Sequence, residues 1–279
     1  MNNLSLKAEK TFKELGLTIG IVILIIICSG IGISYQKLYS KENVDWMAQT
    51  IGQDFSNLLF ISPTLLISGF YASKGNRAAK IIWIGTMITN VYSYVIYCFA
   101  VHFNFLFHVY CIILGLSIYS VINFFIKNKN IDFKSWFSEN TSTKAIGISL
   151  FIIALIFTFM WLSNSLPSAL TNTVPENITK DGLLTNPVQA LDFSFYIPLI
   201  FISSYKVIKK KAEGYLLAPM MMVFAVLTNL NIICLMLVSM KVMHINTVPQ
   251  IIIFSLFTII CLGILYRLLK HVSQENRIE

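Results

Sequence analysis

Charged residues are scarce in this chain. Only 12% of its 279 residues are Asp, Glu, Lys or Arg, whereas 56% are hydrophobic and 13% are aromatic. Soluble domains contain about 25% charged residues on average. The composition therefore excludes an ordinary soluble domain and predicts a protein that crosses the membrane several times.

Sequence motifs for catalysis and metal binding are missing as well. The chain has no nucleotide-binding loop, no Gly-x-Ser-x-Gly and no His-Glu-x-x-His. Its five cysteines lie in apolar segments, and no Cys-x-x-Cys or Cys/His spacing indicates zinc, iron–sulfur or haem. We expect His102, His108 and His244 near the outer surface rather than as haem ligands. The sequence thus predicts no metal and no cofactor, and it argues against a catalyst of the soluble type.

Eight apolar runs are long enough to cross a bilayer, whose hydrocarbon core of about 30 Å requires about 20 helical residues. The predicted spans are residues 16–34, 54–72, 81–101, 104–126, 145–163, 188–207, 215–239 and 248–269. The first is long enough to span and no cleavage site follows it, so we expect it to be a retained anchor. The predicted fold is an all-α bundle of about eight transmembrane helices.

The basic residues alternate between the two sides of these spans. All but four of the 21 are predicted on one side, which the positive-inside rule assigns to the cytoplasm. They are Lys7, Lys10, Lys13, Lys74, Arg77, Lys80, Lys127, Lys129, Lys134, Lys144, Lys206, Lys209, Lys210, Lys211, Arg267, Lys270 and Arg277. Both termini are therefore expected to be cytoplasmic. The net charge of +8 does not indicate nucleic-acid binding, because these residues lie between apolar runs.

Three connecting segments are long enough to carry structure of their own. Residues 35–53 and 164–187 are predicted as outer loops, with Trp46 and Trp161 at or near their edges. The inner segment 131–144 mixes Phe133, Trp136 and Phe137 with charged residues. That composition is typical of a short interfacial helix, or of a linker with anchoring aromatic residues.

Similar features recur at a spacing of about half the chain. The tripeptide Asp-Phe-Ser opens the second predicted helix of each four-helix set, at 54–56 and 192–194, and a proline follows in each (Pro63 and Pro198). Because four is an even number, the two sets would have the same orientation in the membrane. We predict two parallel repeats, 1–139 and 140–279. The alternative is one eight-helix bundle with coincidental similarities.

Three sequence blocks resemble an uncharacterised group of bacterial polytopic inner-membrane proteins. They are NVYSYVIYCFAVHFNFLFHVYCIILGLSIYS (90–120), TNPVQALDFSFYIP (185–198) and GYLLAP (214–219). Members of that group often have histidine at the position of Gln189, so a function that requires an imidazole there is not carried over. The resemblance implies a bacterial inner-membrane location and no particular chemistry.

Two acidic residues are predicted at or inside the membrane boundary. Asp192 is expected about one turn inside its span, and Asp54 at the mouth of its own helix. A charged side chain costs roughly 2.5–3.5 kcal/mol at the centre of a bilayer and usually faces a cavity or a partner. Capping of a helix N-terminus is the simpler explanation, although Asp192 lies deeper than a cap requires.

Polar residues also form a stripe on the third predicted helix. Asn90, Tyr94 and Tyr97 share one face of this helix, which should point away from lipid. Hydrogen bonds between helices are the common explanation for such a stripe. The alternative is a central polar cavity that binds substrate. Its candidate residues are Asp192, Asp54, Asn90, Tyr94, Tyr97, Tyr196, Asn229 and Asn231.

Three functions fit this sequence. The first is a small-solute or ion-coupled permease, in which Asp192 and Asp54 accept a cation or a proton from a polar cavity. The second is a non-transporting sensor, assembly or immunity module that binds a partner through its outer loops. The third is an intramembrane enzyme that modifies a lipid and assembles its site from separate helices. A wet cavity at Asp192 favours the first, and a dry, packed interior favours the second.

Overall fold

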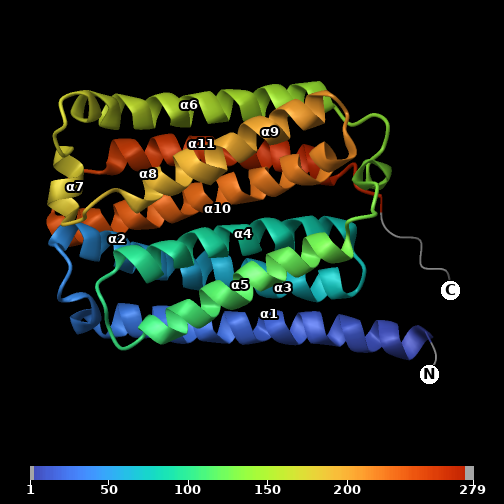
Figure 1. Cartoon of the computed structure of the whole chain (residues 1–279), viewed down its shortest axis with the longest axis horizontal. Helices are drawn as coiled ribbons and strands as arrows, with labels where there is room; N and C mark the ends of the chain where they lie inside the picture. The colour runs from blue at the N-terminus through green and yellow to red at the C-terminus, as the bar shows by residue number, and fades with distance from the viewer. Residues whose placement is uncertain (1–2, 274–279) are drawn as a thin grey trace.

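The computed structural model describes residues 3–273, and eight helical spans run between the two ends of the resulting bundle (Figure 1). The spans are Glu14–Ser34, Val44–Ser73, Arg77–Ala100, Phe107–Lys127, Thr143–Leu170, Pro187–Ile208, Ala212–Met243 and Val248–Leu269. No strand occurs in the described range. The prediction of an all-α membrane bundle with eight spans is confirmed.

Two of the spans are interrupted and are therefore built from more than one helical element. The α-helices are α1 Asn3–Ser34, α2 Val44–Ser56, α3 Ser62–Ser73, α4 Arg77–Ala100, α5 Phe107–Lys127, α6 Thr143–Leu170, α7 Glu176–Asp181, α8 Pro187–Leu191, α9 Ile197–Ile208, α10 Ala212–Met243 and α11 Val248–Leu269. The 3₁₀ segments are η1 Gln36–Tyr39 and η3 Phe133–Trp136. The π segments are η2 Asn57–Ile61 and η4 Asp192–Tyr196.

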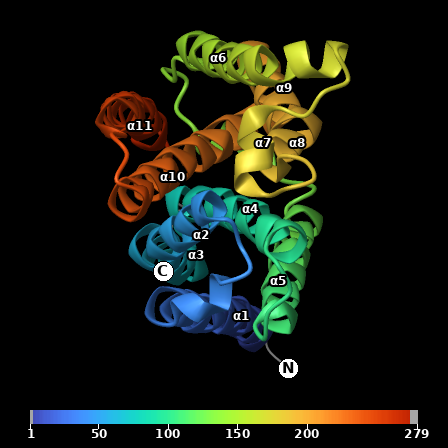
Figure 2. The same ribbon diagram turned by 90° about the vertical axis from the view of Figure 1, so that its left-hand side faces the viewer.

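The spans form two groups, α1–α5 and α6–α11, which meet along α10 (Figure 2). Helix α10 packs against α9 and α11 of its own group and against α2 and α4 of the other group. The buried residues of α10 are mainly apolar, and they include Met220, Met221 and Met222. The contact between the two groups is therefore largely the surface of this one helix.

Two glycines allow α10 to approach the first group closely. A Cβ atom at Gly52 of α2 would lie 2.5 Å from Leu235 Cα, and one at Gly85 of α4 would lie 2.9 Å from the Met220 carbonyl oxygen. Both distances are to backbone atoms, which cannot move aside as a side chain can. Small residues at such crossings permit the van der Waals packing on which helix association in membranes depends.

A π turn interrupts the second span of each group. Each turn contains the residue four positions before a proline, Leu59 before Pro63 and Ser194 before Pro198. Proline cannot donate a hydrogen bond to that residue's carbonyl, and its ring would clash with the carbonyl in a regular α-helix. The wider π turn accommodates the proline without ending the span.

The π turns also give a register in which the two groups can be compared. Asn57 begins the first turn and Asp192 begins the second, so aligning the turns pairs Asn57 with Asp192. The same alignment pairs Asp54 with Gln189 and does not superpose the two Asp-Phe-Ser tripeptides. The division into repeats at 1–139 and 140–279 stays a prediction.

The connecting segments differ in three places from what the sequence predicts. Residues 164–187 are only partly a loop, because α6 continues to Leu170 and α7 covers Glu176–Asp181. Residues 35–53 are not a loop, because α2 already begins at Val44. Segment 131–144 is not an interfacial helix either. It forms the single 3₁₀ turn η3, and its aromatic residues Phe133, Trp136 and Phe137 are buried against the protein. Tyr215 of α10 contacts Phe137.

The two ends of the bundle differ in charge. We call the end at which α3, α5, α9 and α11 finish the basic end, and the other the α7 end (Figure 1). Basic residues at the basic end include Lys74, Lys129 and Lys209. Arg277 and the side chains of Lys7, Lys10 and Lys13 lie outside the described residues. Which end faces the cytoplasm stays a prediction.

We predict that Gly52→Ala destabilises the protein, because the added methyl group meets the α10 backbone. Overpacking of this kind costs about 1–3 kcal/mol. Thermal unfolding in detergent measures it. Gly115→Ala is the matched control, since that helical glycine has nothing within 4 Å of the added Cβ. An equal effect of both substitutions would contradict the close crossing.

Candidate functional site

Asp54 lies in the interior of the first group, about three turns into α2. Its side chain is 1% exposed. The Tyr39 and Tyr97 hydroxyls each donate to one carboxylate oxygen, both at 2.7 Å. The expectation that Asp54 lies at the mouth of its helix and caps it is therefore wrong, because α2 begins ten residues earlier than the predicted span.

The position of Asp54 depends on a glycine in α1. A Cβ atom at Gly32 would lie 2.0 Å from Asp54 Oδ2 and 2.7 Å from the Tyr39 hydroxyl oxygen. Tyr39 itself lies in η1, outside the spans, and burial followed by the charge of Asp54 raises its pKa far above the usual value. Its hydroxyl therefore stays protonated at physiological pH and remains a donor.

A chain of amide groups leads from this carboxylate region to the second group of helices. Asn57 donates to Ser29 Oγ at 3.0 Å and accepts from Gln53 Nε2 at 2.9 Å. Asn231 of α10 donates to Gln53 Oε1 at 2.6 Å. The polar interior of the first group is thus continuous, through Gln53, with the surface of α10.

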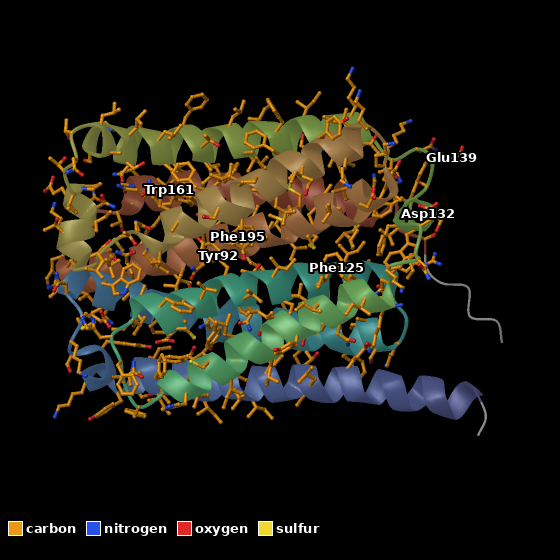
Figure 3. The ribbon with its side chains drawn as sticks, in the orientation of Figure 1. Tyr92, Phe125, Asp132, Glu139, Trp161 and Phe195 are labelled. Carbon is orange, nitrogen blue, oxygen red and sulfur yellow. The ribbon has the colours of Figure 1, made fainter. Side chains whose placement is uncertain are left out.

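Asp192 lies where the two groups meet. Trp161 Nε1 of α6 donates to Asp192 Oδ2 at 2.7 Å, and the Tyr92 hydroxyl of α4 donates to Oδ1 at 3.2 Å. Trp161 and Tyr92 are labelled in Figure 3 and lie toward the α7 end. Asp192 does not cap its helix, because the side chain of Asn186 accepts from Gln189 N at the start of α8. The structure therefore excludes helix capping as the role of Asp192.

A cavity of about 310 Å³ adjoins Asp192. It lies between α2 and α4 of the first group and α6, α8, η4, α10 and α11 of the second. Its lining extends from Trp46, Val101 and Gln250, near helix termini at the α7 end, to Tyr92 and Thr228 deeper in the bundle. Side chains from both groups of helices therefore form its wall.

Three of the eight candidate residues line this cavity: Asp192, Tyr97 and Asn231. Asp54 is separated from it by the Tyr97 side chain, to which it is hydrogen-bonded. Tyr196 is placed beside the site without lining it. Its ring stacks on Phe224 with centroids 4.3 Å apart.

The polar stripe on α4 faces two environments. Asn90 and Tyr94 point into the first group, where Asn90 donates to Ser117 Oγ of α5 at 2.9 Å and the Tyr94 ring contacts Tyr110. Tyr97 lies on the same face of α4, and its side chain lines the cavity.

The last candidate residue, Asn229, is buried in α10, and its side-chain nitrogen lacks a hydrogen-bond partner among the described residues.

Several residues of the site were not anticipated from the sequence. The sequence predicts Gln53 in an outer loop and Trp161 at or near the edge of another. Tyr92 belongs to the same helix as the predicted stripe but faces the opposite group, where it contacts Asp192 and Tyr196. The run Asn90–Tyr97 holds three tyrosines on two faces, and helical spacing alone could have separated them.

Another carboxylate, that of Asp181 in α7, lies beside the cavity at the α7 end, outside the spans. Gln49, which lines the cavity, donates to Asp181 Oδ1 at 3.0 Å. Burial, and then the charge of Asp45, raise the pKa of Asp181 to about 6, and the hydrogen bond from Gln49 opposes this rise. Asp181 thus links α7 to the rim of the cavity.

Comparison with protein-family models, curated proteins and solved structures gives no match for this chain.

We predict that Tyr97→Phe destabilises the protein by about 1–3 kcal/mol, because the buried carboxylate of Asp54 loses one of its two tyrosine donors. Tyr94→Phe is the matched control. Tyr94 lies on the same helix and is equally buried, but its hydroxyl has no hydrogen-bond partner among the described residues. Thermal unfolding in nanodiscs distinguishes the two variants. Equal losses would show that the hydrogen bond to Asp54 contributes nothing specific.

We also predict a pH-dependent stabilisation by Asp181→Asn. Because the pKa of Asp181 is raised in the folded protein, the folded state loses stability as the pH rises from about 4 to about 6. The amide cannot ionise, so the variant should be more stable than the wild type at neutral pH, by on the order of 1 kcal/mol. The difference should vanish below about pH 4. Unfolding temperatures across this pH range test it, with the exposed Glu139→Gln at the basic end as the control.

Proposed function

We propose that this protein is a small-solute or ion-coupled permease whose substrate cavity lies between its two groups of helices. The observation that carries the proposal is the position of Asp192 in the wall of the 310 Å³ cavity, where residues from both groups meet. Transporters place their binding sites between such structural units, often at interrupted helices. The second span of each group is interrupted here by a π turn.

The energetics of Asp192 support a functional rather than a structural role. Its side chain is 9% exposed and accepts hydrogen bonds from two neutral donors, Trp161 and Tyr92. No ion pair to Asp192 occurs among the side chains that the structure describes. An intramembrane carboxylate in this state is costly, and such residues commonly mark substrate or ion pathways.

Asp54 provides a second acidic group close to the same cavity. The Tyr97 hydroxyl contacts its carboxylate and the Tyr97 side chain lines the cavity. We propose that Asp54 accepts the coupling proton or cation while Asp192 contacts the solute. One tyrosine then lies between the two sites, which is a short path for coupling.

The proposed setting is the bacterial cytoplasmic membrane, with both termini in the cytoplasm. The sequence resemblance supports the bacterial membrane, and the excess of lysine and arginine at the basic end supports the cytoplasmic termini. In this orientation the cavity is reached from outside the cell, through the α7 end.

We predict that Asp192→Asn abolishes transport while the protein remains folded and inserted. Currents on solid-supported membranes, recorded with panels of amines, amino acids, sugars and monovalent cations, identify a transported solute. The substitution should reduce its current to the level of membranes without the protein, a loss of at least about tenfold, which corresponds to about 1.4 kcal/mol or more. Asp132→Asn is the control, since this exposed acid lies at the basic end, far from Tyr92 and Trp161 (Figure 3). Unchanged current in Asp192→Asn would refute the assignment.

A further inference from the structure

The polar atoms in the cavity wall that lack a partner are acceptors. Asn231 Oδ1 and Thr228 Oγ1 are buried without a hydrogen-bond partner among the described residues. The Asn231 nitrogen is already used, because it donates to Gln53. A buried polar atom without a partner costs free energy, which a bound donor would recover. The hydroxyl of Thr228 can also donate, but the Asn231 oxygen can only accept.

Asp192 can accept further hydrogen bonds, and it is the only residue in the cavity lining that carries a formal charge. An ionised carboxylate has about four lone-pair sites, and the described contacts from Trp161 and Tyr92 occupy two of them. The cavity lining contains no Lys, Arg or His. The wall therefore presents net negative charge and free acceptors, which suit a cation that carries N–H donors.

The lining does not suit a bare metal ion. Calcium takes six to eight oxygen ligands at about 2.3–2.6 Å, and transition metals require several carboxylate, imidazole or thiolate ligands. No group of three His, Cys, Asp or Glu side chains suitable for a metal occurs in the described residues. Asp192 is a single carboxylate that already has two partners, so it would leave such an ion undercoordinated.

The rest of the cavity wall is apolar and aromatic. Ile96, Ile232, Leu235 and Met236 contribute aliphatic surface, and the rings of Trp161 and Tyr92 lie beside the carboxylate that they contact. Aromatic faces attract cations, and small-molecule sites combine a few polar groups with apolar walls. A volume of 310 Å³ lies at the lower end of the range for such sites. It fits a compact organic molecule rather than a lipid.

We infer that the cavity binds a small organic cation, whose ammonium group contacts Asp192 and Asn231 and whose apolar body packs against the α4 and α10 side chains. This inference deepens the proposed function and rests on it for the placement of the solute in this cavity. It assigns the substrate class as compact primary amines with an apolar part.

Equilibrium binding of labelled phenethylammonium to the full chain in nanodiscs tests this inference without requiring transport. Phenethyl alcohol is the neutral isostere and phenylacetate the anionic one, with empty nanodiscs as the baseline for partitioning into lipid. We expect the wild type to bind the ammonium about tenfold more tightly than the alcohol, and phenylacetate not at all. This comparison needs no variant and so does not depend on the folding of one.

Asp192→Asn should weaken ammonium binding by about tenfold and leave the weak binding of the alcohol unchanged, whereas Asp132→Asn should change neither. Equal affinity for the ammonium in the wild type and Asp192→Asn, or tighter binding of phenylacetate, would overturn the inference.

Uptake of the same probe into proteoliposomes separates the two proposals. Asp192-dependent binding without uptake of the probe or of any solute in the panel would refute the permease and leave the binding site standing. Asp192-dependent transport of another solute, without binding of phenethylammonium, would refute the substrate class and leave the permease standing.

Discussion

Neutral donors, rather than cations, hold the two carboxylates inside this bundle. Asp54 is bonded to two tyrosine hydroxyls, and Asp192 to an indole and a phenol. Each hydrogen bond to a charged group contributes about 1.5–3 kcal/mol, whereas removing a charge from water costs several kcal/mol. Two donors per carboxylate therefore keep the fold intact and still leave each site able to gain free energy from a positive charge.

Polar contacts also join the two groups of helices. Tyr92 on α4 donates to Asp192, and Gln53 on α2 accepts from Asn231, so hydrogen bonds cross the interface at two places in the cavity wall. Close packing at Gly52 and Gly85 brings α10 near enough for these contacts. The geometry of the cavity is thus set jointly by small residues on α2 and α4 and by amide and hydroxyl groups beside them.

Eight spans could be predicted from apolar length alone, because lipid forces each span to satisfy its own backbone. The start of α2 could not be predicted in this way. Gln49, Gln53 and Asp54 lie among apolar residues in its first three turns, and such a mixture is also typical of a loop. For the site, the sequence indicates Asp192, because it is an acidic residue within an apolar run. Its partners Tyr92 and Trp161 depend on which helices become neighbours, and local sequence does not encode that.

The π turn at Asp192 has a mechanical consequence. A π turn holds about one residue more than an α turn, so it offsets the preceding segment by one register position from its place in a regular helix, about 100° around the axis and about 1.5 Å along it. Asp192 is the first residue of that turn. The offset therefore sets the direction in which its carboxylate leaves the span, toward Trp161 and Tyr92. Pro198 keeps this offset in place, because its ring excludes a regular α-helix here.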